Sequence, residues 1–76
     1  MNISDKMGVA IEIIAREEAS KCGFDIESER HGLFRAMAMV FSDKKLLLRA
    51  VEKIKTDDFI EEARSLGIPI PKGGGE

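Results

Sequence analysis

The chain contains one cysteine, Cys22, and one histidine, His31, among its 76 residues. A single cysteine cannot form an internal disulfide, and the two residues together cannot supply the four ligands of a structural zinc site. The sequence therefore predicts neither a metal site nor a cofactor. A chain this short buries only about 60% of the surface that its unfolded form exposes. Self-association is then the remaining means of gaining stability, and a homodimer is one expected state.

Long apolar runs are also missing. The longest one, residues 36–41, is far shorter than the roughly 20 residues that a membrane-spanning helix needs. Residues 1–6 lack a basic region followed by an apolar run, so the sequence predicts no signal peptide. With no membrane partner expected and a free cysteine that suits a reducing compartment, we expect the protein to be cytoplasmic.

The parts of a catalytic site are scarce. Nucleophilic catalysis needs a thiol or hydroxyl beside a base, and His31 is the only imidazole. Adjacent acids such as Glu17 and Glu18 point about 100° apart on a helix and do not converge on a substrate. We expect His31 to lie on the surface and Cys22 to be a buried small apolar residue. The sequence therefore predicts a protein that is not an enzyme.

The apolar residues that are present recur with the period of a helix. A first helix is expected over residues 5–22, where Met7, Ala10, Ile11 and Ile14 define one face. Val9 and Ile13 lie on a neighbouring face and widen the apolar arc beyond what a single contact requires. We therefore expect Val9 and Ile13 to be an interaction surface for a second copy or for another protein.

Cap and stop signals divide the rest of the chain into three further helices. Capping side chains followed by an acid suit helix starts, and a glycine after the periodic residues suits a helix end. Gly23 and Gly67 are such stops. The expected helices are residues 29–41, 43–55 and 57–66, with candidate caps at Ser4, Ser28, Ser42 with Asp43, and Thr56.

The most apolar stretch is residues 33–41, which contain one charged residue, Arg35. A helix that is apolar on nearly all sides is usually buried. The sequence therefore predicts a small all-α four-helix bundle with short loops, in which the helix over residues 29–41 is central and most buried. Residues 1–68 would form a single helical domain, and residues 69–76 a flexible C-terminal tail.

Charges are unevenly placed in the second half of the chain. Residues 43–56 carry a net charge of +3 and residues 57–68 a net charge of −3. Lys45, Arg49 and Lys53 recur every four residues and would form one basic stripe on a helix. Three uses of these charges are open: pairing between the two helices, complementary patches for a second copy, or a stripe for phosphates. A helix-turn-helix is disfavoured because its second helix would carry acids into the major groove.

These patterns favour a small non-enzymatic protein-interaction or regulatory adaptor module, with another protein or a second copy as its partner. The alternative is a small DNA-associated regulatory protein that contacts phosphates through Lys45, Arg49 and Lys53. No aromatic residue is interleaved with that stripe, which disfavours a platform for stacking single-stranded bases.

Overall fold

The computed structural model describes residues 2–56 and 58–70 of the chain. Within these residues there is no strand, and the predicted small all-α four-helix fold is confirmed. None of the helices in this part of the chain combines the length and the apolar character that a membrane span requires. The helices are α1 (Ile3–Lys21), α2 (Gly32–Ser42), α3 (Lys44–Lys53) and α4 (Asp58–Ser65).

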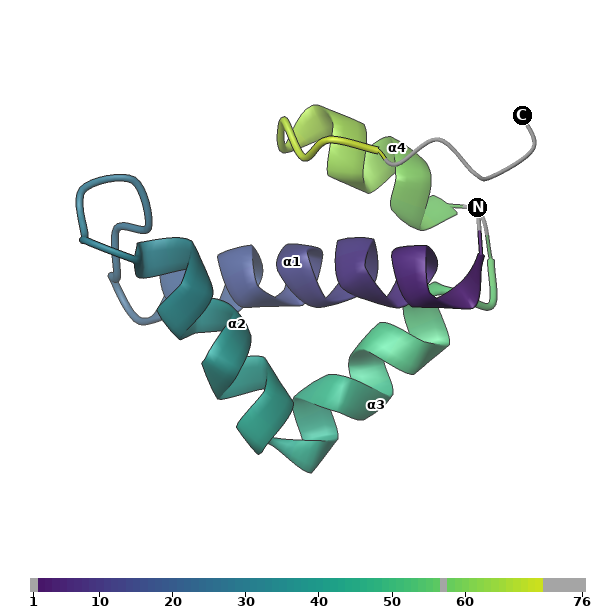
Figure 1. The fold of residues 1–76 in the computed structure, drawn as a ribbon, viewed down its shortest axis with the longest axis horizontal. Coiled ribbons are helices and arrows are strands. Elements are labelled where there is room, and N and C mark those ends of the chain that lie inside the picture. Colours follow the sequence, from purple (N-terminus) through teal and green to yellow (C-terminus); the bar gives the residue numbers. More distant parts are fainter. Residues whose placement is uncertain (1, 57, 71–76) are drawn as a thin grey trace.

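Helix α1 is the centre of the fold. It contacts all three other helices, with α2 and α3 meeting in a V on one side of it and α4 lying on the opposite side (Figure 1). Residues 9–15 of α1 are buried except for Glu12, which is half-buried. The prediction that the helix over residues 29–41 is central and most buried is therefore wrong. The reason is that α1 is covered on two faces by the chain itself, whereas α2 is covered on one.

The buried residues form two clusters, one on each side of α1. Ala10, Ile11 and Ile14 of α1 pack with Ala36 and Val40 of α2 and with Leu46 and Ala50 of α3. On the opposite side, Val9 and Ile13 pack with Phe59, Ala63 and Ile68. The breadth of the apolar arc on α1 thus reflects two separate internal contacts.

Both predicted glycine stops are confirmed. Gly23 and Gly67 have φ values of 73° and 77°, in the left-handed region that glycine enters without steric penalty. After each of them the chain folds back in a Schellman arrangement. The amide of Phe24 donates to the carbonyl of Ala19 at 2.8 Å, and the amide of Ile68 donates to the carbonyl of Ala63 at 2.9 Å. Each stop thereby returns an apolar side chain to the core.

Two helix starts differ from the predicted ones. Asn2 rather than Ser4 caps α1, because its Oδ1 atom accepts the amide of Asp5 at 2.8 Å. Helix α2 begins at Gly32 rather than near residue 29, because His31 has a left-handed φ of 57° that interrupts helical geometry. Residues 25–31 instead form turns, in which the amide of Glu27 donates to Asp25 Oδ1 at 3.0 Å.

The cap of α3 also differs from the predicted one: Asp43 rather than Ser42 caps this helix, and Ser42 is the last residue of α2. Its carboxylate accepts the amides of Lys45 at 2.9 Å and Leu46 at 3.4 Å, which satisfies two donors at the start of α3. The predicted start of the fourth helix at residue 57 lies outside the described residues. Most of the predicted tail also lies outside them, but Ile70 is half-buried against the cluster that holds α4.

Candidate functional site

Helix α2 directs both of its phenylalanines outward. Gly32, Ala36 and Val40 are buried, whereas the side chains of Phe34 and Phe41 are 76% and 59% exposed. At 100° per residue, the two phenylalanines lie on the side of the helix opposite those three residues. The outer face of an ordinary surface helix is polar, whereas that of α2 carries two phenylalanines.

The small inward residues allow the chain to approach α2 closely. A Cβ atom at Gly32 would lie 2.9 Å from the Cα atom of Ile26, closer than such atoms approach in real structures. The neighbour at Gly32 is the backbone of the turn segment rather than another helix. Phe34 and Phe41 therefore extend toward solvent, whereas Met37 is half-buried and packs against the core.

The outward face of α2 is hollowed between the phenylalanines. A cavity of about 430 Å³ is lined by Phe34, Met37, Ala38, Phe41 and Ser42. The four apolar residues have the spacing i, i+3, i+4 and i+7, so they follow one side of the helix for two turns. Ala38 is the smallest of them and leaves a depression between its larger neighbours. We call Phe34, Met37, Ala38 and Phe41 the α2 outer face.

A second hollow adjoins this face at the start of the helix. It has a volume of about 640 Å³ and is lined by Arg30, His31, Phe34 and Arg35. Phe34 lines both hollows, so the apolar surface continues into a basic one. The expected surface position of His31 is confirmed, and its side chain makes no hydrogen bond within the described residues.

The cations around α2 differ from those elsewhere in the structure. Within residues 2–56 and 58–70, six cations have a carboxylate within 4.0 Å: Arg16, Lys21, Arg49, Lys53, Lys55 and Arg64. In the same part of the chain, Arg30, Arg35, Lys44 and Lys45 form no such ion pair, and neither does Lys6 on α1. Four of these five cations lie just before, within or just after α2. Arg30 and Arg35 line the hollow that adjoins Phe34, so this end of the α2 outer face is basic, and Lys44 and Lys45 follow the other end in sequence.

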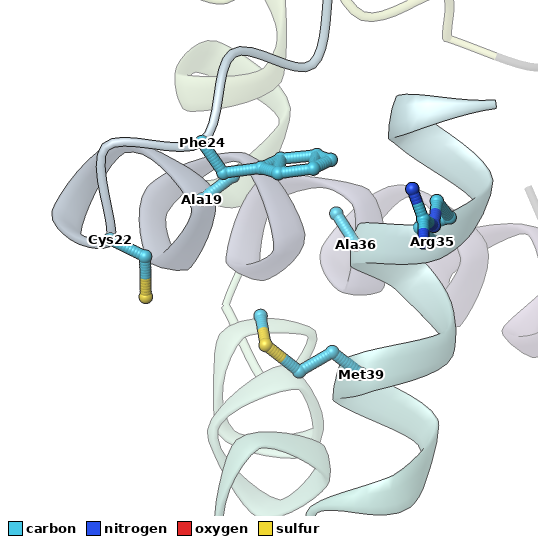
Figure 2. Close-up of a pocket in the computed structure, with 6 residues that line it drawn as sticks. All are labelled: Ala19, Cys22, Phe24, Arg35, Ala36 and Met39. Carbon is cyan, nitrogen blue, oxygen red and sulfur yellow. The ribbon is translucent and has the colours of Figure 1, made fainter. Parts of the chain in front are cut away.

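A third, smaller pocket lies on another side of α2, beside the end of α1. It has a volume of about 200 Å³ and is lined by Ala19, Cys22, Phe24, Arg35, Ala36 and Met39. Figure 2 shows Met39 extending from α2 and the ring of Phe24 extending from the segment after α1, with the opening between them. Its lining is almost entirely apolar, and Arg35 supplies the one charge.

The predicted burial of Cys22 is wrong, because its side chain is exposed. Cys22 is the C-cap residue of α1, where the chain turns away at Gly23 and the core has already ended. Within the described residues no three His, Cys, Asp or Glu side chains are grouped in a way that could hold a metal ion.

Val9 and Ile13 do not form an exposed surface. Their side chains are 4% and 0% exposed, because α4 covers them with Phe59 and Ala63. The expectation that they present a surplus apolar arc to a partner is wrong. The sequence correctly indicates a second apolar face on α1, but the element that covers this face comes from the same chain.

The predicted basic stripe on α3 is largely used inside the structure. Arg49 Nη2 lies 3.0 Å from Glu17 Oε2, and Arg49 Nη1 lies 3.3 Å from Glu18 Oε2, so Arg49 joins α3 to α1. Lys53 Nζ lies 2.8 Å from Glu62 Oε1 on α4. Of the three predicted residues, only Lys45 has no carboxylate within 4.0 Å among the described residues. The expected pairing between the third and fourth helices is confirmed at Lys53, and the pairing with α1 is an addition that the sequence did not indicate.

These contacts shift the titration of the acids in opposite directions. The hydrogen bonds from Lys53 and with Glu17 lower the pKa of Glu62. Burial, followed by the hydrogen bond with Glu62, raises the pKa of Glu17. The hydrogen bond from Lys21, with a further one from Arg49, lowers the pKa of Glu18. Neighbouring lysines therefore favour the charges of Glu62 and Glu18, whereas the surroundings of Glu17 oppose its charge.

Sequence reasoning missed the α2 outer face because it interpreted an all-apolar helix as a buried one. A signal was nevertheless present, since Gly32, Ala36 and Val40 recur every four residues and supply a narrow face of small side chains. Such a stripe suits close packing on one side, which leaves the two phenylalanines on the other. Comparison of the chain with family models, with curated proteins and with solved structures finds no match.

Proposed function

We propose that this protein is a non-enzymatic protein-interaction module of the adaptor or regulatory kind, and that the α2 outer face is its binding surface. The observation that carries the proposal is the outward direction of both phenylalanines of α2. Burial of a phenylalanine side chain contributes about 1.5–3 kcal/mol. Phe34 and Phe41 remain exposed in the folded chain, so a partner that covers both side chains would gain this burial free energy on binding.

The composition of the face supports protein binding. Exposed apolar patches bordered by polar residues mark interaction sites in soluble proteins, and aromatic residues, methionine and arginine are enriched at the centres of interfaces. The α2 outer face contains the first two classes, and Arg35 lies beside it. Methionine also lets a surface adapt to its partner, because its side chain is unbranched.

The DNA-binding alternative loses much of its basis. Two of its three residues, Arg49 and Lys53, already have carboxylate partners on α1 and α4. Phosphate binding by those residues would require the ion pairs to break and would leave acids facing the backbone. We also place the protein in the cytoplasm as part of the proposal, since its one exposed thiol suits a reducing compartment.

Site-specific photocrosslinking in the cell of origin tests the proposal. A photoreactive phenylalanine analogue is placed at Phe34 or Phe41, and at Ile3 as the control, because Ile3 is 71% exposed at the other end of the molecule. We expect a discrete adduct with another protein from positions 34 and 41 and none from position 3. Equal adducts from all three positions, or none from positions 34 and 41, would contradict the proposal.

A further inference from the structure

We infer that the partner of the α2 outer face is an amphipathic helix of another protein whose apolar stripe is flanked by acidic side chains. This inference rests on the proposed function and specifies the chemistry of the partner. Two features of the structure support it: the shape of the apolar face and the distribution of charge around it.

The shape of the face suits a helix. When two helices pack side by side, a side chain of one enters a hole formed by four residues of the other. Phe34, Met37, Ala38 and Phe41 have the spacing of such a hole, and the cavity of about 430 Å³ lies among them. The depression over Ala38 would take one apolar side chain of the partner, with Phe34 and Phe41 on either side of it. A helix contacting this face would carry its own apolar residues at the same spacing, i, i+3, i+4 and i+7.

The charge around the face selects an acidic helix. Arg30 and Arg35 line the hollow beside Phe34. Residues 30–45 carry these two with Lys44 and Lys45 against Asp43, a net charge of +3, and are preceded by Asp25, Glu27 and Glu29, of which Glu27 already pairs with Arg16. The whole chain carries −2, so the other residues carry −5. The carboxylate of Asp43 is already engaged, because it accepts two backbone amides at the start of α3. The four cations have no carboxylate within 4.0 Å among the described residues, so acids of a partner can pair with them without displacing an internal ion pair.

The same charge disfavours a second copy as the partner. A symmetric dimer through the α2 outer face would place the +3 segment of one copy against the +3 segment of the other. Like charges across an interface oppose association and suppress the wrong partner. The homodimer expected from sequence therefore has neither its predicted surface, since Val9 and Ile13 are buried, nor favourable electrostatics on α2.

Binding of two designed peptides tests the inference. Both peptides are helical, carry leucine at positions i, i+3, i+4 and i+7, and bear the same fluorophore. One has glutamate beside the leucine stripe and the other has lysine. Fluorescence anisotropy with the full chain should show about tenfold tighter binding of the glutamate peptide at low salt, with the difference shrinking as salt screens the charges.

Two variants and one matched control locate the binding site. Phe34→Ser with Phe41→Ser should weaken binding of the glutamate peptide by about tenfold or more, because both anchors are lost. Arg35→Glu with Lys44→Glu should reverse the preference between the peptides. Ile3→Ser, which removes an exposed apolar side chain elsewhere, should leave binding unchanged. Circular dichroism of each variant checks that its helices are retained.

Several outcomes would overturn the inference. Equal affinity for the two peptides would contradict the claim that the partner is acidic. If neither peptide bound, the claim that the partner is a helix would be contradicted. In both cases the adducts at positions 34 and 41 would still support the proposed function, whereas loss of those adducts would contradict that function itself. Sedimentation that shows association of the wild type, lost in Phe34→Ser with Phe41→Ser, would identify a second copy as the occupant. Binding to vesicles containing an anionic phospholipid, lost in the same variant, would identify a lipid surface.

Discussion

Lys53 Nζ lies 2.8 Å from Glu62 Oε1 and thereby joins α3 to α4. The same ammonium lies 3.8 Å from Glu17 Oε1 on α1, so Lys53 contacts acids on two other helices. Its side chain is mostly covered, unlike those of the exposed pair Arg64–Glu61 within α4. A residue predicted from sequence to meet a partner thus contributes to the assembly of its own fold.

Replacement of Lys53 by alanine should therefore destabilise the chain. We expect Lys53→Ala to lower the free energy of unfolding by about 0.5–1 kcal/mol, the upper part of the range for partly exposed ion pairs. The matched control is Lys55→Ala, because among the described residues Lys55 pairs only with Glu52, three residues away, and both side chains are exposed. Urea denaturation followed by circular dichroism measures both. If Lys55→Ala lowered the free energy of unfolding as much as Lys53→Ala, the contacts of Lys53 with other helices would not be the cause of its effect.

The two acids beside Lys53 should respond to pH with opposite signs. The pKa of Glu62 is lowered from its ordinary value of 4.5, so its charge adds stability above that value, and this contribution is lost as pH falls through the lowered pKa. The pKa of Glu17 is raised from 4.5, so its charge reduces stability once pH exceeds the raised value. Glu62→Gln should therefore be destabilising at neutral pH, and Glu17→Gln neutral or stabilising.

Urea midpoints at neutral pH and at about pH 3.5 check both expectations, because the two acids are largely protonated in the unfolded chain at the lower value. The difference between each variant and the wild type should shrink on acidification. A Glu17→Gln variant that is less stable than Glu62→Gln at neutral pH would show that the ion pair between Glu17 and Arg49 outweighs the burial of its carboxylate.

The sequence was sufficient for the elements whose signals are local. Gly23 and Gly67 end helices because a left-handed residue is needed there. The boundary between α2 and α3 was predicted to within one residue, with Asp43 rather than Ser42 as the cap, because the side chain of Asp43 reaches amides only two and three residues away. His31 shows the limit of such signals, since a left-handed histidine delays α2 and nothing in its neighbours requires it.

The arrangement of the helices was less accessible, because an apolar pattern does not say what covers it. Val9 and Ile13 were correctly assigned to an apolar face, yet whether that face meets α4 or a second molecule depends on how the chain returns to it. The pairing of Arg49 with Glu17 and Glu18 joins residues on helices far apart in sequence, and it depends on where α3 crosses α1. The α2 outer face was missed for the same reason: covered and uncovered apolar helices have similar sequences.

The contact between α4 and α1 should dominate the stability of the second cluster. Phe59 is among the largest fully buried side chains, and it packs against Val9 and Ile13. Phe59→Ala should lower the free energy of unfolding by about 3–4 kcal/mol. Leu66→Ala is the control on the same segment, because Leu66 is 41% exposed and should contribute less than about 1 kcal/mol. Urea denaturation of both variants measures the difference, and equal losses would contradict the assignment of Phe59 to the core.

The same contact separates the two interpretations of Val9 and Ile13. Val9→Glu with Ile13→Glu should unfold or loosen the chain, because it would place charges beneath α4. Thermal unfolding and sedimentation of the variant show whether Val9 and Ile13 support the fold or form an interface between copies. A well-folded monomer made from a dimeric wild type would instead show that the two residues form an interface between copies.

Two glycines in helices should respond to alanine in opposite directions. Alanine is favoured over glycine in a helix interior by about 1 kcal/mol. Gly8 of α1 has no atom within 4 Å of where a Cβ would lie, so Gly8→Ala should gain most of that amount. At Gly32 a Cβ would meet the backbone of Ile26, with its Cα atom at 2.9 Å, and backbone cannot move aside as a flexible side chain can. Gly32→Ala should therefore be destabilising by about 1–3 kcal/mol despite the better helix propensity.

Thermal and urea unfolding of the two variants test these opposite expectations. Stabilisation by Gly32→Ala would mean that the turn over residues 25–31 does not lie tightly on α2, and that its backbone is not what restricts the inward face of α2 to small residues.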